Sequence, residues 1–347
     1  MTLPIFDLMS DCITIKSKTT LYIGRVKEIV DKVLPKGRVV AIIDANIDRL
    51  YPDLVHRYDH IIIGGGEANK SLNSVATIYD KLMAKGADRS TFILGIGGGI
   101  VTDIAGFVAA TYMRGLDFGF ISTTLLGQVD ASIGGKNGVN VADYKNMVGT
   151  IVQPRFVISD VEMLRTLPLR ELRAGMAEVV KSAIVGDAEL FSYLEGCADD
   201  AALYHHTELM QNIVMRSVAV KLAIVEEDER EGGKRRLLNL GHTLGHAIEK
   251  STHAVNHGEA VAMGLSLIAR ASAKCGMLSV GDAQRIDRLL ERLGFELTPP
   301  VSMPAMLRAV RHDKKKQDNI LRVVMPEGIG RCVVREMPFD EFEQMFC

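Results

Sequence analysis

Apolar and polar positions along the chain predict a different architecture for each half. In the first half, short runs rich in Val and Ile predict strands, and the segments between them carry apolar residues at helical spacing. One such segment repeats apolar side chains every three or four positions from Leu72 to Leu82. Strands that alternate with helices predict a Rossmann-like α/β domain, with a mostly parallel sheet covered on both faces. The expected strands are residues 38–44, 60–64, 92–96, 118–122 and 155–159.

The pattern changes near residue 165, where β-rich runs give way to helical stretches. The second half is therefore expected to be a mainly α-helical domain with one late hairpin, over residues 319–328 and 330–337. Two domains, residues 1–167 and residues 168–347, also suit a chain of 347 residues. The expected helices are residues 167–185, 206–228, 241–250, 258–276 and 280–294.

Composition and charge narrow the function classes. With 47% hydrophobic and 24% charged residues, the chain has the composition of a soluble globular protein. Its formal net charge of −2 argues against a nucleic-acid or membrane binder driven by bulk charge, so an anionic ligand would need a local cluster of cations. The five cysteines are scattered, and the N-terminus shows no signal peptide. These features predict reduced thiols and a cytoplasmic location, with neither nucleic acid nor membrane as a partner.

The most apolar stretch, residues 92–113, is long enough to suggest a membrane span. However, it contains three consecutive glycines, Gly97 to Gly99, and an acidic residue, Asp103. These residues favour a strand, a tight turn and a buried helix instead. Backbone amides at such a turn can bind a pyrophosphate, although a tight turn without a ligand would give the same pattern.

A second glycine run, "IIIGGGEANKS", has two interpretations. It resembles a phosphate-binding P-loop that starts at Gly64 and reaches Lys70, but Asn69 stands where that motif needs its second glycine. In a nucleotidase, Asp160 at the end of "RFVISD" would be the accompanying magnesium-binding carboxylate. Alternatively, Glu67 and Lys70 contact an adenosine ribose or a phosphate.

Polar residues recur at helical spacing in "RRLLNLGHTLGHAIE". Arg235, Asn239, His242 and His246 follow one another at intervals of four, three and four, so a helix would align them in one polar stripe. Such a stripe either lines a cleft or binds something. Together with His257, the two histidines favour a metal site, because two histidines and one carboxylate with an open position suit a catalytic zinc-like ion.

A carboxylate is available in the apolar segment "AGMAEVVKSAI". Glu178 stands three residues before Lys181, which places both on one helix face. On spacing alone, a buried Glu–Lys ion pair explains these residues at least as well as a metal ligand does. Both interpretations therefore stay open at the level of the residues.

Cations and amides gather in "TTLLGQVDASIGGKNGVNVADYKN". Lys136 follows two glycines, and Lys145 precedes Asn146, an arrangement that suits a phosphate-bearing substrate. For any single lysine, an ordinary exposed position is the simpler explanation. The lysine-rich run at residues 311–319 is likewise typical of a solvated face, whereas Lys221 lies in an apolar stretch where a charge needs a reason.

Six motifs, in this order, make the chain resemble the 3-dehydroquinate synthases, which are sugar phosphate cyclases. The motifs are "GGGIVTDIAGFVAATYMRG", "TTLLGQVDASIGGKNGVN", "AGMAEVVKSA", "LNLGHTLGHAIE", "NHGEAVAMG" and "DKKK". The resemblance implies a dehydroquinate synthase-like fold, with NAD in the α/β domain and one divalent metal, zinc or cobalt, in the helical domain. It also implies that the active site lies between the domains and that the protein is a homodimer.

The same resemblance implies an enzyme, a carbon–oxygen lyase acting on phosphates in the shikimate pathway of aromatic amino acid biosynthesis. Its substrate would be a phosphorylated sugar acid, 3-deoxy-D-arabino-heptulosonate 7-phosphate, and its products 3-dehydroquinate and phosphate. The implied route is transient oxidation by NAD, elimination of phosphate, re-reduction and intramolecular aldol closure.

Site residues carry over from the family motifs position by position. The implied metal ligands are Glu178, His242 and His257, with His246 assigned to the phosphate end of the substrate. Arg114 resembles a phosphate contact that the family supplies across a dimer interface. The other implied substrate contacts are Asp130, Lys136, Lys145, Asn146, Lys181, Lys221, Arg235, Asn239 and Lys314. The implied NAD contacts are Asp44, Asn46, Glu67, Lys70, Gly98, Gly99, Asp103, Thr123, Thr124, Lys136, Lys145 and Thr166.

Two positions depart from the family pattern, and three rival functions remain. Ser122 stands where the family usually has proline, and Leu240 where it has phenylalanine; neither side chain does chemistry. The nearest rivals are another sugar phosphate cyclase and a metal- and NAD-dependent polyol dehydrogenase of the same fold. A non-catalytic metal- or nucleotide-binding module is the rival from another class. Such a module would lack some of the lysine and arginine residues that bind the substrate, whereas this chain contains the full set.

Overall fold

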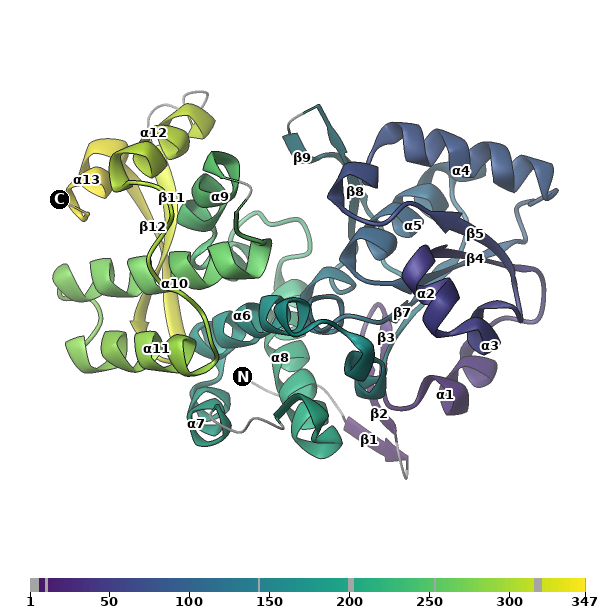
Figure 1. Ribbon diagram of the computed structural model, residues 1–347, viewed down its shortest axis with the longest axis horizontal. Coiled ribbons are helices and arrows are strands. Elements are labelled where there is room, and N and C mark those ends of the chain that lie inside the picture. The colour runs from purple at the N-terminus through teal and green to yellow at the C-terminus, as the bar shows by residue number, and fades with distance from the viewer. Residues whose placement is uncertain are drawn as a thin grey trace. The chain divides into compact units, whose positions relative to one another are not determined.

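The computed structural model describes residues 6–9, 12–142, 144–198, 203–252, 254–314 and 320–346, and only the backbone of residues 6–9, 12–16 and 312–314. The chain forms two compact units (Figure 1). Unit 1 comprises residues Met1–Pro168 together with Met210–Val218, and unit 2 comprises Leu169–Leu209 together with Ala219–Cys347.

Unit 1 alternates strands and helices, as the apolar pattern predicts. Its strands are β1 (Phe6–Met9), β2 (Cys12–Lys16), β3 (Thr20–Ile23), β4 (Val39–Asp44), β5 (Asp59–Ile63), β6 (Phe92–Gly97), β7 (Phe118–Ser122), β8 (Lys136–Val141), β9 (Tyr144–Ile151) and β10 (Phe156–Ser159). Its helices are α1 (Val26–Val33), α2 (Ala45–Leu50), α3 (Pro52–Val55), α4 (Leu72–Ala84) and α5 (Gly99–Thr111), with short helical turns η1 (Glu67–Asn69), η2 (Tyr112–Arg114), η3 (Gly127–Ala131) and η4 (Val161–Thr166).

Eight of these strands form one sheet, in the order β1-β2-β3-β10-β7-β6-β4-β5. The six strands from β3 to β5 in this order pair in parallel, and β1 and β2 extend one edge in antiparallel fashion. The predicted mostly parallel sheet is therefore confirmed, and β4, β5, β6, β7 and β10 match the five expected strands. Strands β1 to β3 and the hairpin β8–β9 were not expected from the sequence.

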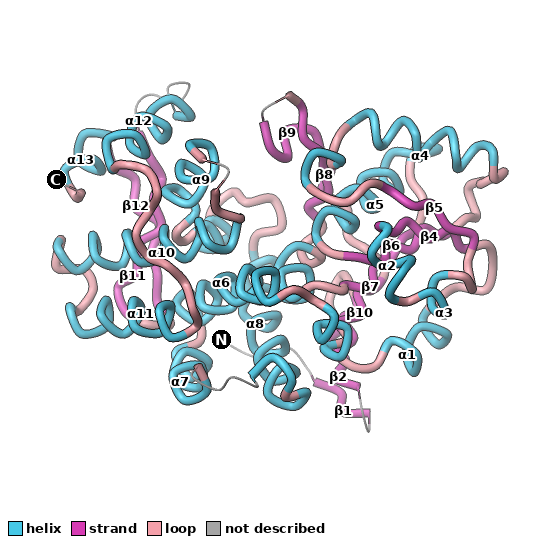
Figure 2. The backbone as a smooth tube through the Cα atoms, viewed as in Figure 1, coloured by secondary structure: helices cyan, strands magenta, loops and turns pink. Residues whose placement is uncertain are grey.

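Helices cover both faces of this sheet (Figure 2). On one face, Ala41 and Ile43 of β4 belong to a core that includes residues of α1, α2 and α3. On the other face, α5 packs over β6 and β7. Gly95 lies beneath α5, where an added Cβ would come within 3.0 Å of the Ala105 Cβ. The missing side chain therefore lets this helix approach the sheet closely.

The strand order reverses between β4 and β6. The chain passes from β4 to β5 at one edge and then returns to β6 on the other side of β4. Open α/β sheets bind ligands beyond the carboxyl ends of the strands at such a reversal. Asp44 at the end of β4 and Gly98 after β6 stand at this place.

Unit 2 is mainly helical, as predicted, and carries the late hairpin. Its helix α10 packs against α6, α9 and α11 and against the hairpin strand β11 (Figures 1 and 2). The hairpin β11–β12 is antiparallel. The elements are α6 (Leu169–Gly186), α7 (Ala188–Cys197), η5 (Leu203–His205), the two ends of α8 (Thr207–Glu227), η6 (Lys234–Asn239), α9 (His242–Ser251), α10 (His257–Lys274), α11 (Val280–Arg292), α12 (Met303–Lys314), β11 (Ile320–Gly328), β12 (Arg331–Pro338) and α13 (Phe339–Gln344). The middle of α8, Met210–Val218, belongs to unit 1.

The apolar stretch at residues 92–113 forms β6, a glycine turn and the buried helix α5, as the glycines and Asp103 indicate. Among the described residues, no helix combines the length and the apolar character that a membrane crossing requires.

Candidate functional site

Three ligand-type side chains from three helices of unit 2 meet at one point. The carboxylate atom Oε1 of Glu178 on α6 lies 3.5 Å from Nε2 of His242 on α9 and 3.2 Å from Nε2 of His257 on α10. The donor atoms of these three residues lie within 4.8 Å of one another. One carboxylate and two imidazoles are a donor set that suits a zinc-like divalent ion.

Local backbone features place the three ligands. Gly241 precedes α9 with a left-handed φ of 77°, so α9 begins at His242 itself. Asn256 and Glu259 form a capping box that starts α10 at His257. Gly258 lies against α6, and a Cβ added there would come within 2.2 Å of the Ala174 Cα. The absence of this side chain lets α10 approach the helix that carries Glu178.

Both histidines present the same ring nitrogen to the cluster, because their other nitrogen is engaged. Nδ1 of His242 lies 3.0 Å from the carbonyl oxygen of Leu240, which can only accept, so Nδ1 donates there. Nδ1 of His257 lies 3.2 Å from Oε2 of Glu249. In each ring Nε2 is therefore the nitrogen whose lone pair a metal would use. Since Leu240 contributes through its backbone, its departure from the family pattern has no consequence here.

The two oxygens of Glu178 have different partners. Oε2 forms an ion pair with Lys181, one turn further along α6, and both side chains are buried. Burial alone would raise the pKa of Glu178, but Lys181, His242 and His257 together hold it well below its ordinary value. The buried Glu–Lys pair is therefore present, and it leaves Oε1 facing the two histidines, so the pair does not exclude a metal at this carboxylate.

His257 lies between two carboxylates. Burial lowers the pKa of its ring, but the hydrogen bonds with Glu178 and Glu249 outweigh burial and raise it to about 10. Without a metal, the ring is thus a cation shared by the two acids. A metal ion must displace the proton on Nε2 before it can bind there.

His246 belongs to a second, overlapping group. It stands one turn after His242 on α9 and meets Glu249 and His257, whose donor atoms lie within 4.8 Å of its own. It is not part of the group that contains Glu178. The geometry thus separates the two histidines of "GHTLGH", with His242 facing Glu178 and His246 facing Glu249.

The expected polar stripe from Arg235 to His246 is wrong as a single helical face. Residues 234–239 form the short turn η6, and the left-handed Gly241 separates it from α9. Arg235 is buried, and its guanidinium donates to the carbonyl oxygen of Glu229. Asn239 donates to Oε1 of Glu231 at 2.6 Å, a contact that was not predicted.

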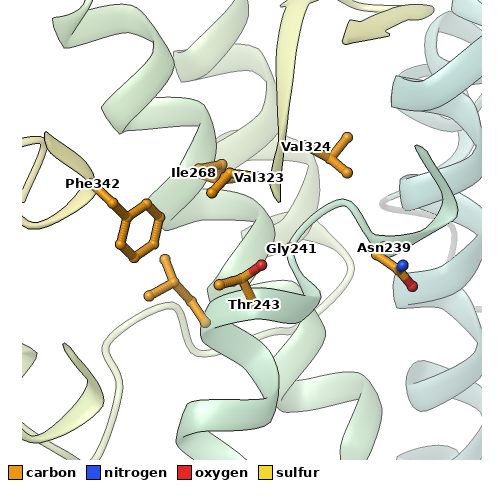
Figure 3. Close-up of a pocket in the computed structure, with 9 residues that line it drawn as sticks. Asn239, Gly241, Thr243, Ile268, Val323, Val324 and Phe342 are labelled. Carbon is orange, nitrogen blue, oxygen red and sulfur yellow. The ribbon is translucent and has the colours of Figure 1, made fainter. Parts of the chain in front are cut away.

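A small pocket lies next to this segment but does not have the chemistry of the site (Figure 3). Thr243 and Leu244 of α9 line it, whereas His242, His246 and Glu249 of the same helix are not among its lining residues. Asn239 and Gly241, which precede α9, also line it, and the remaining lining residues are apolar or glycine and come from α10, the late hairpin and α13: Gly264, Ile268, Val323, Val324 and Phe342. Such a lining does not suit a phosphorylated sugar acid.

Unit 1 offers a turn suited to phosphates beyond β6. Gly98 precedes α5 and has no side chain to cap it, so the first amides of this helix are open to a ligand. A Cβ at Gly98 would come within 2.7 Å of Cγ2 of Thr124, which follows the neighbouring strand β7. On the other side of the strand reversal, Asp44 accepts hydrogen bonds from the amides of Asn46 and Ile47 and so fixes the start of α2.

Lys70 is the centre of a polar network in unit 1. Its buried ammonium donates to Oδ2 of Asp103 and, at 2.6 Å, to Oδ1 of Asn146. Asn140 bridges this network to Glu67, since its amide donates to Glu67 Oε1 at 2.7 Å and its Oδ1 accepts from the Asn146 amide. Asn146, assigned above to the substrate, thus lies with residues assigned to NAD. Asn140 was missed by the sequence interpretation.

The P-loop interpretation is wrong. Lys70 is engaged by Asp103 and Asn146. Asp160, the proposed magnesium ligand, accepts hydrogen bonds from the amides of Val26 and Glu162 at 2.9 and 3.0 Å. Both oxygens of this carboxylate are therefore used in hydrogen bonds to the backbone.

Two consecutive segments of the chain match family models. Residues 60–174 match the model described as 3-dehydroquinate synthase N-terminal, and residues 175–316 match the model described as 3-dehydroquinate synthase C-terminal. The chain belongs to the 3-dehydroquinate synthase family. Enzymes of this name from Microcystis aeruginosa and Natranaerobius thermophilus are 42% and 40% identical to it. The first alignment covers 79% of this chain and 76% of that protein, and the second covers 93% of both.

A solved structure of the 2-epi-5-epi-valiolone synthase ValA from Streptomyces hygroscopicus, with NAD+ and Zn2+ bound, is 29% identical to the chain. It superposes with a TM-score of 0.85 and covers 95% of this chain and 96% of its own. A 2-deoxy-scyllo-inosose synthase in complex with carbaglucose-6-phosphate, NAD+ and Co2+ is 25% identical, with a TM-score of 0.83 and coverage of 94% and 95%. The dehydroquinate synthase-like fold expected from the motifs is thereby confirmed.

Each unit carries part of the site that the 3-dehydroquinate synthase motifs imply. Unit 2 brings together the three expected ligands with Lys181 and His246, and it also holds Lys221, which is buried on α8. Unit 1 holds the expected NAD residues and five of the expected substrate contacts, namely Arg114, Asp130, Lys136, Lys145 and Asn146. Lys314 ends α12, but its side chain lies outside the described part of the chain.

The two units also contain features that the sequence did not single out. Glu249 was missed, although it stands seven residues after His242 and hence on the same face of α9. In unit 1, Asp48, His56 and His60 bring their donor atoms within 4.8 Å of one another. His56 is exposed and lies 3.3 Å from the Asp48 carboxylate, as an ordinary surface pair would.

Proposed function

We propose that the protein is a 3-dehydroquinate synthase that converts 3-deoxy-D-arabino-heptulosonate 7-phosphate to 3-dehydroquinate and phosphate. The observation that carries this proposal is the preorganised group of Glu178, His242 and His257 in a chain that belongs to this family. Its relatives of this name share about 40% of its residues over most of its length.

The cofactors would be NAD and one divalent metal, zinc or cobalt, since structural neighbours are described with NAD+ and Zn2+ or Co2+. When bound, NAD would provide reversible hydride acceptance, and the metal would provide a Lewis acid that lowers the pKa of a substrate hydroxyl. Glu178, His242 and His257 would hold it, which leaves positions for two substrate hydroxyls.

The residues of unit 1 would bind NAD beyond the carboxyl ends of β4, β6 and β7. The open amides of α5 after Gly98 suit the pyrophosphate. Asp44 and Asn46, on the other side of the strand reversal, would contact a ribose. The remaining NAD contacts would be Glu67, Lys70, Gly99, Asp103, Thr123, Thr124, Lys136, Lys145 and Thr166.

The cationic and amide residues would bind the phosphate and carboxylate of the substrate, because such anions need local cations in a protein with a net charge of −2. Lys181, Lys221 and Arg235 are buried, so their charges act in a medium of low polarity. His246 would hold the phosphate end of the substrate. The other contacts would be Asp130, Lys136, Asn146, Asn239 and Lys314.

Arg114 would reach the phosphate from the partner subunit of a homodimer. Its φ of 71° and the φ of 49° at Met113 are left-handed, a backbone conformation that costs energy for residues other than glycine. Such a turn supports a functional role for this position. A sedimentation measurement of the oligomeric state, together with the activity of Arg114→Ala, tests this assignment.

The decisive experiment measures phosphate release from the heptulosonate phosphate, with and without a chelator, while NADH absorbance is recorded. We expect phosphate release that a chelator abolishes and added Zn2+ or Co2+ restores, with no net accumulation of NADH. Net NADH formation from a polyol would instead indicate a dehydrogenase. Release of phosphate with a product other than 3-dehydroquinate would indicate another sugar phosphate cyclase.

A further inference from the structure

A buried carboxylate lies directly behind one of the proposed metal ligands. The Glu249 side chain is only 8% exposed, and its Oε2 atom lies 3.2 Å from Nδ1 of His257. Nε2 of the same ring lies 3.2 Å from Glu178. The imidazole is therefore held at both nitrogens, by one acid from α9 and one from α6.

The two ligand histidines differ in the group behind them. His242 is oriented by the backbone carbonyl of Leu240, which a change of side chain leaves in place. His257 is instead oriented by a side chain, that of Glu249. An acceptor at Nδ1 fixes the ring rotation and keeps the proton on that nitrogen, so that the lone pair of Nε2 faces the metal.

Glu249 has two conceivable roles, because it also belongs to the group formed with His246 and His257. As a ligand, its carboxylate would bind the metal and give up the contact between its Oε2 and Nδ1 of His257. That arrangement would take the ring nitrogen away from its hydrogen bond. The contact between Oε1 of Glu178 and the Nε2 atoms of both His242 and His257 already provides a three-ligand group without Glu249.

We propose that Glu249 is a positioning residue, which accepts a hydrogen bond from Nδ1 of His257 and thereby aligns Nε2 with the metal. This inference rests on the proposed role of Glu178, His242 and His257 as ligands. It predicts that the carboxylate affects how tightly metal binds but not how many protein ligands the metal has.

The test measures the affinity of the purified protein for Zn2+ by competition with a chromophoric chelator. Loss of such a second partner typically weakens metal binding by about 10- to 100-fold, and we expect this for Glu249→Ala. Glu249→Gln keeps an oxygen that can accept from Nδ1 and should restore much of the affinity. Glu171→Ala is the matched control, since it removes an exposed acid from the first turn of α6 and should leave the affinity unchanged.

The visible spectrum of the Co2+-loaded proteins separates positioning from ligation. We expect Glu249→Ala saturated with Co2+ to bind one ion and to keep the ligand-field bands of the parent. A change of coordination in that spectrum would show that Glu249 is a ligand. A Zn2+ affinity of Glu249→Ala within twofold of the parent would refute the inference. That result would leave the proposed function standing if the parent still releases phosphate in a metal-dependent manner.

Discussion

Replacement of Glu178 by glutamine should separate two functions that this carboxylate combines. Its Oε1 faces His242 and His257, and its Oε2 pairs with Lys181. Glutamine keeps the size of the side chain but removes the charge. We therefore expect the variant to lose metal binding and, in addition, to lose stability in the metal-free state.

The stability loss follows from burial. Lys181 is 1% exposed, so its ammonium would remain in the interior without the carboxylate that now pairs with it. Removing one partner of a buried ion pair costs roughly 3–5 kcal/mol, whereas replacing both partners by neutral groups of similar volume is often close to neutral. Glu178→Gln should therefore lower the free energy of unfolding by about this amount, and Glu178→Gln/Lys181→Met should recover most of the loss.

Urea unfolding of the chelator-treated proteins measures the free energies, and metal analysis measures binding. Both variants should lack metal, while only the single variant should be strongly destabilised. Acidity supplies an internal check. Because the pKa of Glu178 is held below its ordinary value of 4.5, its ionised form stabilises the fold above that pH, and this contribution is lost as the pH falls further. A single variant as stable as the double variant would refute the electrostatic argument for Lys181.

Three further substitutions test the other parts of the proposed site. His242→Ala should lose both metal and activity. His246→Ala and the control His56→Ala should keep near-stoichiometric metal, and of these two only His246→Ala should lose turnover. Equal metal loss in the His242 and His246 variants would mean that His246 is a ligand. Gly98→Val should abolish NAD binding in a titration, because its Cβ would lie 2.7 Å from Thr124, while metal content stays intact; an unchanged NAD titration would contradict the role of this turn. Lys136→Met should lower kcat/KM by about one to two factors of ten, since a charge-assisted contact contributes roughly 1.5–3 kcal/mol; a value within twofold of the parent would mean that Lys136 is an ordinary exposed lysine.

The arrangement of the sheet could be predicted where periodicity is strong. Strands β4, β6, β7 and β10 are largely apolar runs, and such runs are typical of strands buried on both faces, whereas the edge strand β5 shows only a short run of isoleucines. The hairpin β8–β9 was missed because its strands are not apolar runs. β9 is almost entirely exposed, and the segment carries glycines, asparagines and lysines that are equally common in loops.

The metal group shows where residue spacing stops being informative. Intervals of four, three and four residues predict one helical face only if the helix is continuous, and a single left-handed residue, Gly241, ends that continuity. The break starts α9 at His242, so Arg235 and Asn239 in η6 do not continue the helix that carries His242 and His246. Spacing within one segment also cannot reveal a partner on another helix. Glu178 and Glu249 approach His257 from α6 and α9, and only the packing of α10 against both helices determines which nitrogen each acid meets.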